Sequence, residues 1–397
     1  MSVVRRPIAT PSLPRPHGLA VGRWRPSALS SVDRLVVGRW LTLAIFTILS
    51  GQSFFHLAAH HHAPIILAAW PALVLLAVRF PVLSIFVAAG LLRAGFSVVC
   101  CTDQIIVSQS AWERVISGQG SPYGVGYAST DPPGSPFPYG PLALVWWLPG
   151  PPLELVAAAA VMGILAWKRA LLTLAVFAVW EPSVWLNLVG VNDYSPGLLL
   201  LLATLALRTR PMLGAAIISV AAALKPYAFA WFLPVIGYGG VSAAVVLFSI
   251  SAVLWSPLFL WWGGVGPFLE TVRLASQVHQ IPNAVNLPAL RWFAVPIAIA
   301  GVSARRWESA ILVGSAAFAV FLFMDKWASY SYWLAILPAT GLAIESMLGF
   351  YRPSPVDAPA GSRLQIAPRA LLGGLKPAPA LIVAADRLPR NARDSSR

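Results

Sequence analysis

The chain has 397 residues, of which 58% are hydrophobic and only 11% are charged. A soluble domain carries about 25% charged residues, so this composition excludes an ordinary soluble enzyme and predicts a multi-pass membrane protein. The 28 basic residues outnumber the 14 acidic ones. Most of that excess lies in the two tails and in short loops, as the positive-inside rule expects, so nucleic acid is not an expected partner.

Three parts are expected. Residues 1–34 are rich in Pro, Arg and Ser without an early apolar core, which predicts a disordered basic tail rather than a signal peptide. Residues 35–350 hold the hydrophobic segments, and residues 351–397 form a second Pro-, Ala- and Arg-rich tail. The expected fold is all-α: a polytopic transmembrane helical bundle of about twelve spans, whose extracytoplasmic loops carry short surface helices. Both termini are expected in the cytoplasm of a cell-membrane protein.

Charges between the hydrophobic segments fix their direction. Residues 212–237 are either one span kinked at Pro226 or two short spans that meet outside at Lys225, and we favour two because one span would put Arg305 and Arg306 outside. The expected spans are then 35–58, 64–78, 81–101, 139–167 (broken near Gly150), 170–189, 194–207, two within 212–237, 241–262, 292–304, 310–324 and 327–350.

The longest polar interval inside the hydrophobic part runs from Asp103 to Leu142 and is expected outside. A carboxylate at the outer end of a span is partly desolvated, which favours a general base, although Asp103 is equally suited to cap the helix that follows. Residues 111–116 have the pattern of a helix lying flat on the membrane. Tyr123 is placed either to stack on a sugar or to sit in the interfacial aromatic belt.

Basic residues inside or between the spans are candidates for an anion site. Lys225 is expected as a lone base on the outer side, where it either binds a phosphate or snorkels to the headgroups. Arg93, within the third span, has the same two interpretations or a buried partner. In the second external loop Arg273, His279, Asn283 and Asn286 are polar groups that could reach the same external cavity, and Lys326 lies at the outer end of the last hairpin.

Other reaction classes lack their motifs. The sequence has no phosphate-binding P-loop, no dinucleotide GxGxxG and no HExxH. His60–His62 resemble a metal tract in composition but lack spaced ligands, so no metal is expected and no cofactor is required.

With these residues in view, the chain resembles the GT-C superfamily of membrane glycosyltransferases, and within it the actinobacterial polyprenyl-phosphate-dependent mannosyltransferases. The resemblance lies in three stretches: Asp103 with the following surface helix, Gly118–Tyr123 and Pro136–Leu142; Ala223–Pro226; and Asn283–Asn286. Two departures are the three expected spans before Asp103, where the family usually has one, and Tyr-Gly-Pro in place of the frequent Tyr-Pro-Pro.

The resemblance implies an inverting transfer of a hexose, with mannose the first choice, from a polyprenyl-phosphate sugar donor to a lipid or glycan acceptor outside the membrane. Asp103 would be the general base, and Lys225, with Arg93 or Arg273, would bind the donor phosphate. The implied substrate-binding residues are Tyr123, Tyr139, Asn192, Asp193, His279, Asn283, Asn286 and Lys326.

Two other functions remain open. A transporter or flippase of lipid-linked sugars would also use broken helices and intramembrane charges, but it would place polar residues near the midplane on several helices. A non-catalytic scaffold that has kept the fold is the third hypothesis.

Overall fold

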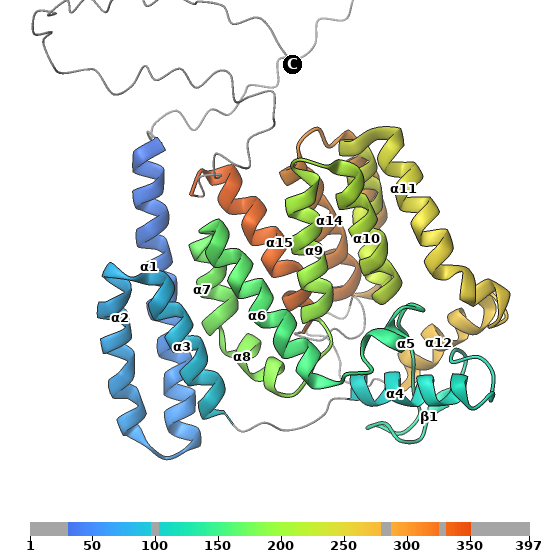
Figure 1. Cartoon of the computed structure of the whole chain (residues 1–397), viewed down its shortest axis with the longest axis horizontal. Helices are drawn as coiled ribbons and strands as arrows, with labels where there is room; N and C mark the ends of the chain where they lie inside the picture. Colours follow the sequence, from blue (N-terminus) through green and yellow to red (C-terminus); the bar gives the residue numbers. More distant parts are fainter. Residues whose placement is uncertain (1–30, 97–102, 279–286, 325–330, 351–397) are drawn as a thin grey trace, which may run out of the picture. The chain divides into compact units, whose positions relative to one another are not determined.

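The computed structural model describes residues 31–96, 103–278, 287–324 and 331–350, all within one compact unit, Met1–Pro353. Regular structure in the described part is helical (Figure 1), apart from a two-residue antiparallel ladder in which β1 (Gly126–Tyr127) pairs with β2 (Ser135–Pro136). The prediction of an all-α fold is therefore confirmed.

Prolines set where many of the helices begin. A proline suits the first turn of a helix because backbone N–H groups there have no partner within the helix, so the absence of one costs no hydrogen bond. Its φ angle is also already helical. The helices that begin on a proline are η1 (Pro64–Ala68), α3 (Pro81–Gly95), α6 (Pro151–Lys168), α10 (Pro211–Leu224), η2 (Pro226–Trp231) and η3 (Pro288–Phe293).

The first helices form a layer against α7. The 30-residue α1 (Ser31–His60) contacts η1, α2 (Ala69–Arg79), α3 and α7 (Leu171–Val179). Buried apolar side chains such as Phe46, Ile85 and Leu92 fill the space between them.

The predicted span 170–189 is not one continuous helix. It is divided into α7 and α8 (Glu181–Leu188), which meet at an angle of 55°. Trp180 is extended at the break, and Pro182 in the first turn of α8 cannot continue the hydrogen bonding of α7. The sequence analysis expected a span here but not its bend, because it weighed hydrophobicity above this proline.

The breaks predicted at Gly150 and Lys225 are confirmed. Gly150 has a positive φ of 74° between the short α5 (Ala143–Trp146) and α6. Lys225 is extended between α10 and η2, because the residue before a proline is disfavoured in the helical conformation. The other helices are α9 (Tyr194–Leu207), α11 (Phe232–Leu260), α13 (Ala294–Ala300), η4 (Gly301–Ser303), α14 (Trp307–Phe323) and α15 (Ser331–Leu348).

Two stretches of the described chain are long and apolar enough to cross a membrane: α6 and the stretch Pro226–Leu260, which consists of η2 and α11 and is kinked at Gly240. The bent pair α7–α8 makes a third if it counts as one span. Six further apolar helical stretches have only 10–17 residues, and 17 residues at 1.5 Å each cover about 26 Å of a hydrocarbon core about 30 Å thick. These helices fit a membrane location, while the total of about twelve spans stays a prediction.

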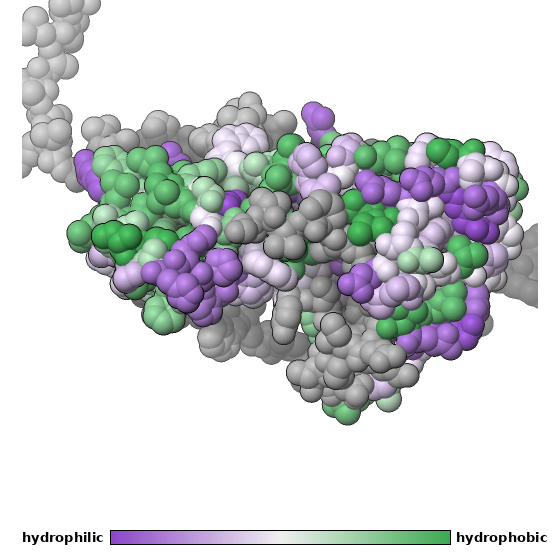
Figure 2. All heavy atoms as spheres, turned by 90° about the horizontal axis from the view of Figure 1, so that it is seen from below, coloured by the Kyte–Doolittle hydropathy of each residue, from purple (hydrophilic) through white to green (hydrophobic). Residues whose placement is uncertain are grey.

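The two polar loops contain the short helices that were expected. They are α4 (Asp103–Ile116) and α12 (Val265–Val278), and the loop after α4 joins them: Gly124 N donates to Thr271 Oγ1 at 2.7 Å, and the Tyr123 ring lies 5.5 Å from that of Phe268. Figure 2 views the molecule from below relative to Figure 1, and this face carries both hydrophilic and hydrophobic side chains.

Candidate functional site: a buried ion pair at the end of a helical hairpin

The site is built on the hairpin of α9 and α10. Each helix has 14 residues, about 21 Å at 1.5 Å per residue, and they are joined by the short turn at Arg208–Arg210 and pack against each other. Because the two helices are equally long and run in opposite directions, the residue before α9 and the residue after α10 meet at the same end. Those residues are Asp193 and Lys225.

Asp193 and Lys225 form an ion pair that is almost completely buried. Lys225 Nζ lies 2.6 Å from Asp193 Oδ1, and the two side chains are 3% and 0% exposed. Tyr227 donates its hydroxyl proton to the same oxygen at 2.9 Å. The prediction that Lys225 is a lone base is therefore wrong: a buried ammonium group is stable here because a carboxylate balances its charge.

Aromatic rings surround the lysine. Its Nζ atom lies 5.2–5.9 Å from four ring centroids, those of Tyr139, Trp147, Tyr227 and Tyr332. Rings at this distance attract a cation through their negative faces. Rings and carboxylate together hold the ammonium group in a fixed position.

The loop that precedes α5 attaches to the end of α10. Gly140 N donates to Leu224 O, and Leu142 N to Ala223 O, each at 3.1 Å. These carbonyls belong to the last turn of α10, whose C=O groups have no partner within the helix. A Cβ atom at Gly140 would lie 2.1 Å from Ala223 O, so only glycine permits this approach. Two of the stretches that carry the family resemblance, Pro136–Leu142 and Ala223–Pro226, are thus in direct contact.

Tyr123 supports this loop from inside the protein. Its hydroxyl donates to Tyr139 O at 3.0 Å, and its ring packs on those of Phe137, Trp262 and Phe268. Burial raises the pKa of the Tyr123 phenol, which therefore stays a hydrogen-bond donor. Tyr123 holds the ring of Tyr139 beside Lys225, rather than sitting exposed in an interfacial belt.

The sequence analysis missed Glu154, a buried carboxylate that lies beside the ion pair. It accepts hydrogen bonds from Trp147 Nε1 at 2.7 Å and Ser195 N at 2.9 Å, and a third from the Ser195 hydroxyl. Glu154 thereby satisfies an unpaired N–H in the first turn of α9, and it shares Trp147 with Lys225. An acidic residue inside an apolar span is itself a signal of a buried polar site.

The start of α4 lies beside the loop that carries Asp193. The side-chain oxygen of Gln104 accepts a hydrogen bond from Asn192 N at 3.1 Å, and a Cβ at Gly190 would lie 3.3 Å from Ile105 Cδ1. Asp103 is the first residue of α4. The backbone of the predicted general base is therefore at the same end of the hairpin as Lys225.

Buried polar atoms near the pair have no partner in the described part of the chain. They are both side-chain polar atoms of Asn192 and Oδ2 of Asp193. A buried polar atom without a hydrogen bond costs about 1–3 kcal/mol, so such atoms are candidates for contact with a ligand or with water. Sequence analysis assigned both residues to substrate binding.

The other two cations predicted for the phosphate site have partners different from those of Lys225. Arg93 donates to Asn187 Oδ1 at 3.0 Å and to Ala178 O at 2.9 Å, so it ties α3 to α7 and α8. Arg273 forms an exposed pair with Glu270, one turn away on α12, and this hydrogen bonding lowers the pKa of Glu270. The prediction that Arg273 joins Lys225 in one anion site is therefore not supported by its contacts.

Four predicted residues, His279, Asn283, Asn286 and Lys326, lie outside the described residues. In the described part no group of three or more His, Cys, Asp or Glu residues could hold a metal ion. Comparison of the chain with protein-family models, curated proteins and solved structures gave no match.

Proposed function

We propose that the chain is a membrane glycosyltransferase that moves a hexose, with mannose as first choice, from a polyprenyl-phosphate donor to a lipid or glycan acceptor. We further propose about twelve spans with both termini in the cytoplasm, so that α4, Asp193 and Lys225 lie on the extracytoplasmic side. Three separate predictions from sequence, at Asp103, Asp193 and Lys225, concern residues gathered at one end of the α9–α10 hairpin.

One observation carries the proposal: the ion pair lies beside an apolar groove of about 230 Å³. Side chains of η2, α13 and α14 line it. Tyr227 is one of them, and its hydroxyl donates the hydrogen bond to Asp193 of the ion pair. A lipid chain in the groove would have its phosphate near Tyr227 and Lys225. An apolar route that ends at a buried cation suits a lipid phosphate better than a soluble sugar nucleotide.

The chemistry needs a base and a stabilised leaving group. An acceptor hydroxyl oxygen would attack the anomeric carbon while its proton passes to the Asp103 carboxylate. The bond from that carbon to the phosphate oxygen would break, and polyprenyl phosphate would leave. The arriving phosphate would compete with Asp193 for the ammonium of Lys225, which would then stabilise the negative charge of the leaving group.

The test is sugar transfer from polyprenyl-phosphate-mannose to a lipid extract by purified protein. General base catalysis contributes about 10²- to 10⁴-fold, so Asp103→Asn should lose that much activity. Glu113→Gln is the matched control, because it also replaces a carboxylate by a carboxamide, at an exposed position of the same helix. Equal transfer by wild type and Asp103→Asn would remove Asp103 from the mechanism. The proposal would be overturned if the folded wild-type protein transferred none of mannose, arabinose and glucose from their polyprenyl-phosphate donors.

A flippase of lipid-linked sugars is the second candidate, because the helix breaks at Lys225 and Gly240 and the buried charges are features that transporters share. Liposomes that hold the protein and a labelled lipid-linked sugar, but no acceptor, separate the two functions. Movement of the label between leaflets without transfer in the first assay would favour the flippase.

A further inference from the structure

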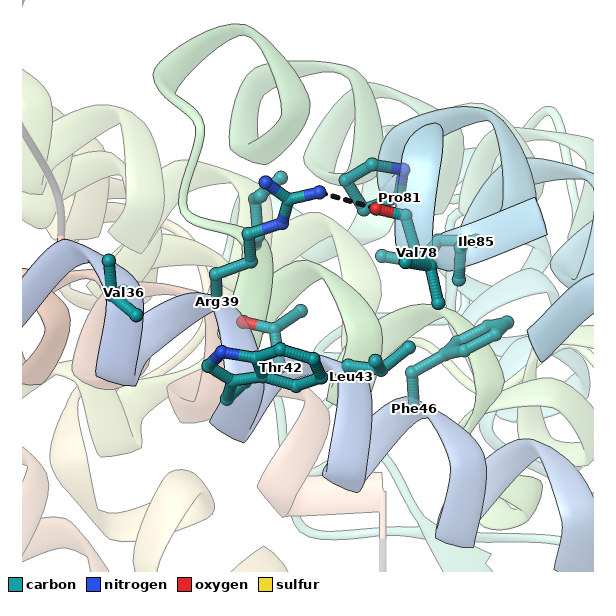
Figure 3. A pocket seen from close by; sticks show the side chains of 11 residues that line it. Val36, Arg39, Thr42, Leu43, Phe46, Val78, Pro81 and Ile85 are labelled. Atoms are coloured by element: carbon teal, nitrogen blue, oxygen red, sulfur yellow. Dashed lines mark hydrogen bonds between the residues drawn. The ribbon is translucent and has the colours of Figure 1, made fainter. Parts of the chain in front are cut away.

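A second cavity lies at the opposite ends of α3 and α7 from the ion pair. The ring of Tyr194, the residue after Asp193, lies 5.8 Å from that of Phe177 near the C-terminal end of α7, and Arg93 ties the C-terminal half of α3 to Ala178 at that same end. The cavity instead contacts the first residues of these helices, Pro81 and Leu171, together with α1 and the end of α2. Figure 3 shows apolar side chains around it, including those of Leu43 and Phe46.

An arginine stands at the edge of this cavity. Arg39 donates from Nη2 to Val78 O at the end of α2, a bond drawn dashed in Figure 3. A guanidinium group has five N–H donors, so this bond leaves donors for a second acceptor. Arg39 is exposed, and the exposed indole of Trp40 belongs to the same lining.

Two further arginines lie close to lining residues along the chain, and the buried carboxylate of Glu345 accepts hydrogen bonds from Thr173, two residues after Leu171. Arg79 is exposed one residue after Val78, and Arg169 is exposed two residues before Leu171. Asp33, the nearest acidic residue along α1, precedes Arg39 by six residues, which is almost two helical turns and about 9 Å along the axis. An apolar cavity with Arg39 at its edge therefore favours a molecule with a hydrocarbon part and an anionic head.

We propose that this cavity binds one acyl chain of an anionic phospholipid, whose phosphate accepts hydrogen bonds from Arg39. The volume, about 230 Å³, is below the roughly 300–1,000 Å³ of sites that enclose a drug-sized ligand, so it suits part of a chain and leaves the headgroup outside. Trp40 suits the boundary between headgroups and hydrocarbon, where tryptophan is enriched. The inference does not depend on the transferase activity.

The experiment is native mass spectrometry of the full-length protein with phosphatidylglycerol or phosphatidylcholine of identical acyl chains. Phosphatidylglycerol should bind about fivefold more tightly, because one arginine near an anionic lipid is worth about 1 kcal/mol. Arg39→Gln should make the two lipids equal. Ala77→Leu, which adds volume to a buried part of the lining, should weaken the binding of both.

Arg210→Gln is the matched control, since Arg210 is exposed but belongs to the α9–α10 turn. It should retain the preference for phosphatidylglycerol, and soluble glycerol phosphate should not compete. The proposal is overturned if wild type binds both lipids equally, or if Arg39→Gln keeps the preference. It is also overturned if the lipid binds only after removal of residues 1–30, which would make that segment the occupant.

Discussion

Two ion pairs of this protein, Lys225–Asp193 and Arg273–Glu270, differ in what surrounds them. The first is 3% and 0% exposed and joins residues 32 positions apart, whereas the second is 56% and 40% exposed and joins residues one helical turn apart. The sequence suggested that both cations belong to one anion site. A cation near a predicted site is therefore a strong candidate for that site only when the fold buries it and pairs it with a residue that is distant in the sequence.

Removing the buried cation is expected to have the largest effect. Lys225→Met leaves the Asp193 carboxylate buried without its counter-charge, and breaking a buried pair in this way costs about 3–5 kcal/mol. Reversible denaturation in mixed micelles would measure the loss. The double variant Lys225→Met with Asp193→Asn should recover most of it. A double variant no more stable than Lys225→Met would show that the pair does not act as a unit.

The contact of the loop with α10 should be the next most sensitive feature. Gly140→Ala places a methyl group 2.1 Å from Ala223 O, so loop or helix must move, at a cost of about 1–3 kcal/mol. Gly90→Ala is the matched control, because a Cβ there meets no atom within 4 Å and alanine suits a helix better than glycine. Equal stability of the two variants would contradict the close approach.

Removing one hydroxyl from the buried cluster tests its weaker part. Tyr227→Phe deletes the hydrogen bond to Asp193 Oδ1, but Lys225 still satisfies that oxygen, so the expected loss is about 1 kcal/mol. The same denaturation experiment measures it. A loss as large as that of Lys225→Met would mean that the tyrosine, rather than the lysine, holds the carboxylate.

The exposed pair should matter least. Arg273→Gln removes a pair that water already screens, and such pairs contribute about 0–1 kcal/mol. We expect unchanged stability and unchanged sugar transfer. A large loss of transfer with normal stability would return Arg273 to the phosphate site and contradict the separation of the two pairs.

Much of this site could be predicted from the sequence. Two apolar segments joined by a short basic turn place Asp193 and Lys225 at the same end of a hairpin, and Pro226 predicts the extended residue after α10. The pairing of the two charges was not predicted. The proline- and glycine-rich sequence around Tyr139 and Gly140 also predicts a turn, although the segment that this turn contacts does not follow from local pattern.

Other features depend on contacts between distant segments. Glu154 and Ser195 are 41 positions apart, and the ring of Tyr332 reaches Lys225 across more than 100 positions. Local pattern fixes where helices begin and end, but it does not say which helices pack together. For the same reason Lys225 looked unpaired. The bend between α7 and α8 was missed although Pro182 marks it in the local sequence.

Photolabelling tests the central claim, that a lipid phosphate meets the buried pair through the groove of η2, α13 and α14. A polyprenyl-phosphate-mannose with a diazirine in its first isoprene units would be irradiated with the full-length protein, and the labelled peptides would be identified by mass spectrometry. Labels are expected within residues 226–230, 294–298 and 317–321, and they should be lost when unlabelled donor is added. Labels that fall elsewhere, or that unlabelled donor does not displace, would contradict it.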